Sequence, residues 1–118
     1  MVKLICFVRR KPGMDAEEFH RYWREHHGPL IAATKSGSHV LRYEQNHRVR
    51  EHWDQPGYDG VTEQWFASVE DFFASLQEDD YPRIEADVAK FIDTERLEWI
   101  ITEEPEVVMG GGQDVIGR

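Results

Sequence analysis

The chain has 118 residues, with 14 lysines and arginines against 23 aspartates and glutamates, so its formal net charge is −9. This length supports one domain, and the acidic charge argues against nucleic acid or an anionic membrane as a partner, because both bind basic surface. The single cysteine, Cys6, excludes an internal disulfide framework and indicates a reducing, cytoplasmic setting, and the apolar run Leu4–Val8 is too short for a membrane span or a signal-peptide core.

The first predicted elements are a strand and a helix. Residues 2–9 have apolar side chains on both alternating faces, which predicts a strand at a central place in its sheet. A helix-start signal follows, in which Asp15 precedes an acid three residues later, Glu18. An apolar stripe then recurs at helical spacing and consists of Phe19, Trp23, His26 and Leu30. On this helical wheel His26 lies on the stripe, and His27 lies at its margin.

The helix is expected to be interrupted at Gly28-Pro29, because proline disfavours the helical conformation in the residue before it. A short second turn is predicted over residues 31–33. Residues 39–49 predict a second strand, and its charged face is typical of an edge strand. A loop over residues 50–60 leads to a third predicted strand over residues 61–67.

The remaining chain predicts two helices over residues 68–77 and 80–92 and a fourth strand over residues 97–101. The resulting order is typical of a ferredoxin-like α+β fold, βαββαβ, with a four-stranded antiparallel sheet and helices on one face. No further element is left to cover the other face, so we expect a homodimer whose sheets pack face to face. This domain is expected to span residues 1–108, with a flexible tail over 109–118, because three consecutive glycines resist ordering.

Two adjacent histidines form the first candidate site. His26 and His27 stand next to Gly28-Pro29, and an imidazole there can take or give a proton near neutral pH. The expected helix break allows either ring to point inward. The alternative is a helix-terminal histidine that hydrogen-bonds to carbonyl groups at the end of the helix.

Glu63 is the second candidate. It shares a strand face with Val61 and Trp65. If that face is covered, partial desolvation raises the pKa of the carboxyl group and suits it to general acid or base catalysis. The alternatives are an ion pair with Arg42 or Arg48 on the neighbouring strand, or an exposed position.

A polar row on the second predicted strand is the third candidate, and it consists of Tyr43, Gln45 and His47. Their hydroxyl, amide and imidazole groups can orient a polar ligand while Trp23 and Trp65 form the walls, a combination typical of small-molecule pockets. The alternative is a cross-strand polar ladder on a solvated edge.

Metal and cofactor motifs are absent from the sequence. The six histidines include no His-Glu-x-x-His pattern and there is no cysteine pair, so we expect no metal site. No glycine-rich phosphate loop follows a strand, so we expect no cofactor. Cys6 lies inside the first predicted strand and is expected to be an inert core residue.

Several short motifs follow one another in a recognisable order. The most specific is Phe19-x-x-x-Trp23 followed by His27-Gly28-Pro29-Leu30, and three further segments support it: Tyr43–His47, Asp59–Phe66 and Thr102–Glu104. Together they resemble the EthD family of small dimeric α+β barrel proteins, and the resemblance extends over nearly the whole chain. The segment Glu63–Ser68 also resembles the methylmuconolactone methylisomerases, which share this barrel.

The resemblance implies a ferredoxin-like monomer, a homodimer and a pocket between each sheet and its helices. It also implies that a histidine of the first helix moves protons. The EthD motif points to His27 for this role, whereas the spacing from Phe19 in the methylisomerases points to His26.

The leading hypothesis is a cofactor-independent enzyme of the isomerase or cyclase type that acts on a small cyclic, aromatic or lactone-like compound. His27 or His26 transfers a proton with the aid of Glu63, and the substrate is contacted by Trp23, Tyr43, His47 and Trp65. One alternative is a cofactor-free oxidoreductase, such as a monooxygenase, or a haem-handling barrel. Another is a non-catalytic binding protein that accompanies a degradation pathway.

Overall fold

Four strands form one antiparallel sheet in the computed structural model, which describes residues 1–110. The strands are β1 (Val2–Val8), β2 (Arg42–His47), β3 (Gly60–Phe66) and β4 (Glu98–Glu103). Their order across the sheet is β2-β3-β1-β4, and each neighbouring pair is antiparallel. The central place of the first strand and the edge place of the second are therefore confirmed.

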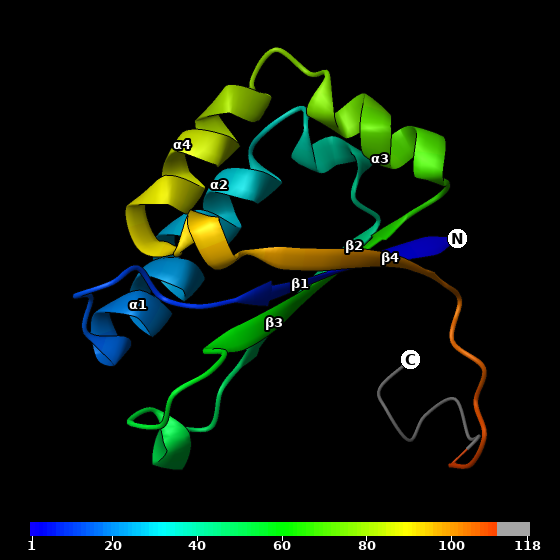
Figure 1. Ribbon diagram of the computed structural model, residues 1–118. Coiled ribbons are helices and arrows are strands. Elements are labelled where there is room, and N and C mark those ends of the chain that lie inside the picture. The colour runs from blue at the N-terminus through cyan, green and yellow to red at the C-terminus, as the bar shows by residue number, and fades with distance from the viewer. Residues whose placement is uncertain (111–118) are drawn as a thin grey trace.

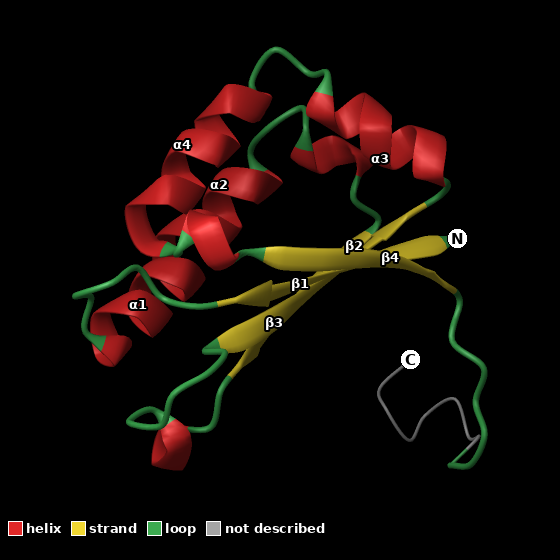
Figure 2. Ribbon diagram, in the orientation of Figure 1, coloured by secondary structure: helices red, strands yellow, loops and turns green. Residues whose placement is uncertain are grey.

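The helices form a second layer on one face of this sheet (Figure 1). They are α1 (Ala16–Tyr22), a π-helical turn (Trp23–His27), α2 (Gly28–Ala32), α3 (Val69–Leu76) and α4 (Tyr81–Phe91). Short 3₁₀ turns occupy Gly37–His39, Arg50–His52 and Thr94–Arg96, and the second of these lies in the β2–β3 loop, away from the helical layer (Figure 2). The predicted ferredoxin-like α+β fold is confirmed, whereas residues 111–118 of the predicted tail lie outside the described residues.

Two helices begin where their capping residues predict. The Asp15 carboxylate accepts a hydrogen bond from the Glu18 backbone N–H at 3.3 Å, and the Ser68 hydroxyl accepts one from the Asp71 N–H at 3.1 Å. Asp80 behaves differently. Its carboxylate accepts from backbone N–H groups in the turn after α2 and so ties that turn to the start of α4.

The strand predicted over residues 39–49 begins later than expected, at Arg42, because a tight turn precedes it. The Val40 N–H donates to the Gly37 carbonyl at 2.9 Å and closes this turn. A Cβ atom at Gly37 would lie 1.9 Å from the carbonyl oxygen of Ile31, so the turn requires glycine at this position.

The helix is not interrupted at Gly28-Pro29, so that prediction is wrong. Gly28 keeps right-handed helical angles (φ −57°, ψ −54°), and its N–H donates to the carbonyl of Trp23, five residues back. Proline carries no N–H and cannot bond the carbonyl four residues before it. The chain accommodates this defect with one wider π-helical turn over Trp23–His27, a feature that often marks functional sites.

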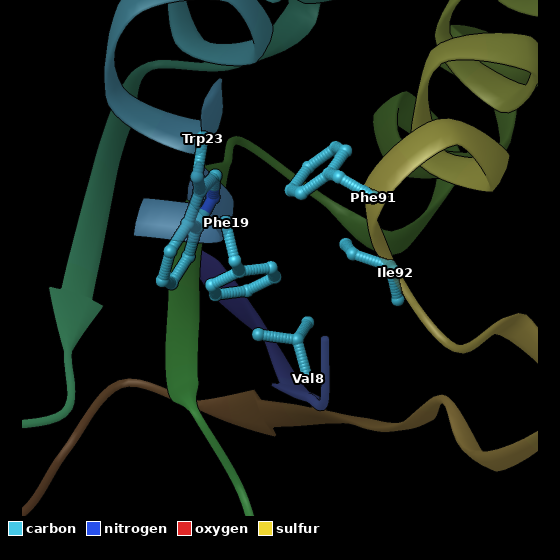
Figure 3. Close-up of a cluster of buried hydrophobic side chains, with 5 residues drawn as sticks. All are labelled: Val8, Phe19, Trp23, Phe91 and Ile92. Carbon is cyan, nitrogen blue, oxygen red and sulfur yellow. The ribbon is translucent and has the colours of Figure 1, made fainter. Parts of the chain in front are cut away.

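The helical layer packs on the sheet through a cluster of fully buried apolar side chains from β1, the first helix and the end of α4 (Figure 3): Val8, Phe19, Trp23, Phe91 and Ile92. A Cβ atom at Gly60 of β3 would lie 2.6 Å from the ring of Trp23. Glycine at that position therefore allows the indole to pack this close to the sheet.

The sheet face without helices, here called the outer face, carries both apolar and charged side chains. Alternation along the paired strands places Ile5, Phe7, Val61 and Ile100 on it, together with Lys3, Glu63 and Trp65. Ile100 is 51% exposed. None of the helices within residues 1–110 has the length and apolar character needed to span a membrane.

Candidate functional site

A cavity of about 270 Å³ lies between the sheet and the helical layer. Its walls are mostly apolar and come from both layers of the fold, including Leu4, Val8, Ile31, Phe66, Phe72, Ile84, Val88 and Trp99. A few polar side chains also reach it, among them His27, Tyr43, Thr62 and Gln64. An apolar hollow with a small number of polar groups is the usual form of a small-molecule site.

His27 is a titratable group of this cavity that pairs with a carboxylate. Its side chain is buried, and Nδ1 lies 2.8 Å from Oδ2 of Asp87 on α4. The Tyr22 hydroxyl donates to the other carboxylate oxygen at 2.5 Å. An ionised carboxylate only accepts hydrogen bonds, so Nδ1 of His27 carries the proton, and Nε2 is left as a basic lone pair available to a ligand.

The ionisation states agree with this assignment. Burial lowers the pKa of His27, and Asp87 offsets this only in part. Burial alone would raise the pKa of the Asp87 carboxyl, but the hydrogen bonds from Tyr22 and His27 outweigh it and lower that pKa. Burial and Asp87 together raise the pKa of Tyr22 to about 12. At neutral pH the group therefore consists of a neutral imidazole, a carboxylate and a phenol.

The two adjacent histidines have different surroundings. His27 lines the cavity, whereas the side chain of His26 is exposed and packs on Tyr22 with ring centroids 5.0 Å apart. The regular helical wheel places His26 inward, but the wider π-helical turn changes the angular position of each residue after Trp23. The structure thus brings His27, and not His26, to the cavity.

Glu63 and Trp65 differ from the expectation that they share a pocket with Trp23, because they lie on the outer face. The Glu63 carboxylate is 3.0 Å from Nζ of Lys3 and accepts a hydrogen bond from Asn46 at 3.0 Å. The predicted alternative of an ion pair therefore describes its surroundings, with Lys3 as the partner in place of Arg42 or Arg48. Lys3 also lies 5.1 Å from the centre of the Trp65 ring.

The polar row on β2 faces the helices, and its members lie at different depths. Tyr43 lines the cavity. Gln45 donates to the Tyr43 hydroxyl oxygen at 3.0 Å, and its Oε1 lies 2.8 Å from Nε2 of His47. His47 is thus connected to the cavity through Gln45 and Tyr43. Trp23 lines the cavity directly, and its indole nitrogen is buried.

Three residues of this arrangement were not among the sequence candidates: His20, Tyr22 and Asp87. Nδ1 of His20 lies 2.7 Å from Nδ1 of His47. Asp87 did leave a signal in the sequence. It lies next to Val88 and three residues after Ile84, on the apolar stripe of its helix, where a carboxylate is unusual. His20 and Tyr22 flank the stripe of the first helix and have no comparable pattern.

Cys6 is partly buried, packs against both hydrophobic core clusters and also lines the cavity. Burial raises the pKa of its thiol, and a hydrogen bond with Thr62 offsets this in part. Within residues 1–110, no cluster of three or more histidine, cysteine or acidic side chains is arranged to hold a metal ion.

The comparisons with known proteins agree with this architecture. The fold is similar to an ethyl tert-butyl ether d (EthD) family protein from Bacillus halodurans, with a TM-score of 0.68, 21% identity and coverage of 89% of this chain and 99% of that chain. An EthD-like protein from Ralstonia eutropha gives a TM-score of 0.62 and 20% identity over 86% of this chain and 89% of that chain.

A dimeric protein of unknown function and ferredoxin-like fold from Bacteroides fragilis gives a TM-score of 0.64 and 11% identity over 87% of this chain and 95% of that chain. No curated protein matches the sequence. The model of the EthD domain matches residues 11–95, which is more than half of the chain. The chain therefore belongs to the EthD family.

Proposed function

We propose that this protein is a cofactor-independent enzyme that moves a proton on a small cyclic, aromatic or lactone-like carbonyl compound bound in the cavity. The observation that carries the proposal is the buried hydrogen bond between His27 and Asp87 at the cavity wall. It fixes the tautomer of the imidazole and leaves Nε2 as the base. Trp23 and Tyr43 are the predicted substrate contacts that line the same cavity.

The proposed reaction begins with the removal of a proton from the substrate. Nε2 of His27 takes a proton from the carbon next to the substrate carbonyl, and the electrons of that C–H bond form the C=C bond of an enolate. The negative charge moves to the carbonyl oxygen, and the imidazolium is stabilised by the Asp87 carboxylate at 2.8 Å. Return of the proton to another carbon gives an isomer. Attack of the enolate carbon on a second carbonyl of the same molecule closes a ring, and the alkoxide formed there takes the proton back from the His27 imidazolium.

The geometry also bears on the alternative of a non-catalytic binder. A purely apolar pocket with both histidines in solvent would favour that class. Here a base with an ordered carboxylate partner lies at an apolar wall, and burial lowers the pKa of His27, so the base is neutral and ready at physiological pH. A binding protein has no need of such a pair.

We also propose that a second copy of the chain covers the outer face. Apolar side chains from β1, β3 and β4 meet there, and Ile100 is about half exposed in the single chain. The likeness to a dimeric protein from Bacteroides fragilis supports this arrangement. The cavity lies on the opposite face, so a partner packed there leaves the cavity to the helices of its own subunit.

The catalytic proposal is tested by proton exchange, because an enolising enzyme exchanges substrate C–H for C–D in D₂O. A panel of small cyclic ketones and lactones is incubated with the protein, and exchange is followed by NMR. We expect at least one compound to exchange faster with the wild type. His27→Gln should slow that exchange roughly 10²–10⁴-fold.

His26→Gln is the matched control, because His26 is the exposed neighbour of His27 in the same helical turn. It should exchange at the wild-type rate, and both variants should keep the wild-type circular dichroism spectrum. A folded His27→Gln protein that exchanges at the wild-type rate would contradict the proposal. Binding of panel compounds without any exchange would favour the non-catalytic alternative.

A further inference from the structure

We propose that a buried hydrogen-bond chain from His20 through His47 and Gln45 compels Tyr43 to act as a hydrogen-bond donor into the cavity. The Tyr43 hydroxyl is then the donor for an oxygen atom in the cavity that only accepts hydrogen bonds. The identification of this atom as the carbonyl and enolate oxygen of the substrate rests on the proposed function. The direction of each hydrogen bond rests only on the structure.

The backbone carbonyl of Trp23 determines which group donates in each hydrogen bond of this chain. Nε2 of Gln45 lies 2.9 Å from that oxygen and 3.0 Å from the hydroxyl oxygen of Tyr43. A carbonyl oxygen can only accept, so the amide nitrogen of Gln45 faces it and donates to both oxygens. The Tyr43 oxygen is therefore an acceptor toward Gln45, and its own proton is left to donate elsewhere, toward the cavity that Tyr43 lines.

The hydrogen-bond chain continues from Gln45 to His47 and His20. Oε1 of Gln45 only accepts, so Nε2 of His47, at 2.8 Å, must carry a proton. Burial is the main cause that lowers the pKa of His47 to about 4, so the ring is neutral at pH 7 and its Nδ1 is an acceptor. Nδ1 of His20, 2.7 Å away, must then donate.

This assignment explains an otherwise unusual feature of His20. The ring is only 1% exposed and stacks on Trp53, and its Nε2 is buried with no hydrogen-bond partner among residues 1–110. If Nδ1 carries the proton, Nε2 is a bare lone pair. Leaving that lone pair unpaired avoids burying an N–H donor without an acceptor.

The indole of Trp23 supports this hydroxyl and is not itself a donor to the cavity. Its side chain is fully buried, and its nitrogen has almost no surface open to the cavity. A hydrogen bond from Trp23 is one of the causes that lower the pKa of Tyr43 against the larger rise from burial. A hydroxyl that donates to an anionic oxygen stabilises charge as it develops, in the manner of an oxyanion hole.

The polarity of the site defines a substrate class. Tyr43 offers a proton, and Nε2 of His27 offers a lone pair. A ketone or lactone with an acidic C–H bond next to its carbonyl group satisfies both groups. An amine that can only donate in place of the carbonyl oxygen leaves the Tyr43 hydroxyl unpaired, and such mismatches are strongly rejected.

The first test reads the tautomers directly and needs no substrate. In protein labelled with ¹⁵N in its histidines, the ring nitrogen shifts at neutral pH distinguish a protonated nitrogen from a bare one. We expect His47 to carry its proton on Nε2 and His20 to carry its proton on Nδ1. The opposite tautomer at either ring would overturn the proposal.

The second test measures the Tyr43 donor with two probes of similar shape, 4-nitrophenolate, which accepts, and 4-nitroaniline, whose amino group donates. All measurements use protein that carries His27→Gln, which lacks the proposed base, so the result is independent of turnover. In that background Tyr43→Phe should weaken 4-nitrophenolate binding roughly 10- to 100-fold. Binding of 4-nitroaniline should be unchanged.

Two substitutions at His47 test the hydrogen-bond chain that ends at Tyr43, again in protein that carries His27→Gln. His47→Leu removes the donor to Gln45 and should reduce the preference for 4-nitrophenolate, whereas His47→Gln supplies an amide N–H and should restore it. Equal losses for both probes, or no binding of 4-nitrophenolate by the parent protein, would overturn the proposal. Success here without substrate exchange would leave the donor site standing and refute only the catalytic proposal.

Discussion

Oδ2 of Asp87 lies 2.8 Å from Nδ1 of His27, although the two residues are 60 positions apart in the chain. One comes from the π-helical turn and the other from α4, so the contact exists only where the two helices pack. Because Tyr22 holds the other carboxylate oxygen, the carboxylate has a fixed orientation. The imidazole is thereby oriented toward the cavity.

Asp87→Asn is expected to weaken the base while the fold persists. Asp87 raises the pKa of His27 against the larger lowering by burial, so loss of its charge should lower that pKa further. The exchange rate rises with pH as His27 loses its proton, so the midpoint of this rise should move to lower pH. The maximal exchange rate should fall roughly 10- to 100-fold. NMR titration of His27 and the pH–rate profile give the two measurements.

Asp79→Asn is the matched control for that substitution, because Asp79 makes an exposed ion pair with Lys35 on the surface. It should change neither the pKa of His27 nor the rate. An unchanged pKa of His27 in Asp87→Asn would contradict the role assigned to this carboxylate.

The stability of the fold should fall as the pH falls, in part because of His47. Its pKa is lowered from 6.5 to about 4, so between these values the unfolded chain binds a proton that the folded protein refuses. We expect a loss of roughly 2–3 kcal/mol from this group over that range. Burial also lowers the pKa values of His20 and His27, and they add in the same direction.

Urea unfolding between about pH 7 and about pH 4 measures this dependence. His47→Gln should make the curve of unfolding free energy against pH shallower, because glutamine does not titrate. His52→Gln, at an exposed histidine, should leave the slope unchanged. A wild-type slope in His47→Gln would show that His47 is not held neutral in the folded state.

Two glycine substitutions should affect stability with opposite signs. Gly60→Ala places a Cβ atom 2.6 Å from the Trp23 ring and should destabilise the fold by about 1–3 kcal/mol. Gly28→Ala is compatible with its helical angles and should gain about 0.5–1 kcal/mol of helix stability. Its Cβ atom lies 3.1 Å from Nε2 of Gln45, so it should disturb the hydrogen bond to Tyr43.

Thermal unfolding and 4-nitrophenolate binding separate the two effects. Gly28→Ala is expected to melt no lower than the wild type and yet to bind the probe less tightly. A stable Gly28→Ala protein that binds 4-nitrophenolate as tightly as the wild type would argue against the hydrogen-bond chain through Gln45. A Gly60→Ala protein as stable as the wild type would contradict the close packing of Trp23 on β3.

The dimer can be tested with two equally exposed apolar residues on opposite sides of the sheet. Ile100 on the outer face is 51% exposed, and Phe73 of α3 is 53% exposed. At micromolar concentration, light scattering should give about twice the chain mass for the wild type and for Phe73→Lys. Ile100→Lys should give a monomer, because it places a charge in the proposed interface. A monomeric wild type would refute the arrangement.

The helix caps and the strand order were predicted from local signals and agree with the structure, whereas the helix break expected at Gly28-Pro29 does not occur. The caps at Asp15 and Ser68 need only neighbouring N–H groups, and the strand order follows from the alternation of apolar and polar residues along the chain. Alternation also correctly put Val61, Glu63 and Trp65 on one face. It does not specify which face the helices cover, and the structure places these three on the other side from Trp23.

Local sequence signals also do not specify which side chains meet in the candidate site, so its composition depended on the tertiary structure. Whether His26 or His27 points inward follows from one π-helical turn, which changes every angle after Trp23. The partnership with Asp87 follows from how α4 packs on that turn. Composition and periodicity thus determined the elements and their order, because those signals act over a few residues. Contacts between residues far apart in the chain decided which groups meet in the cavity, because they exist only after the layers have packed.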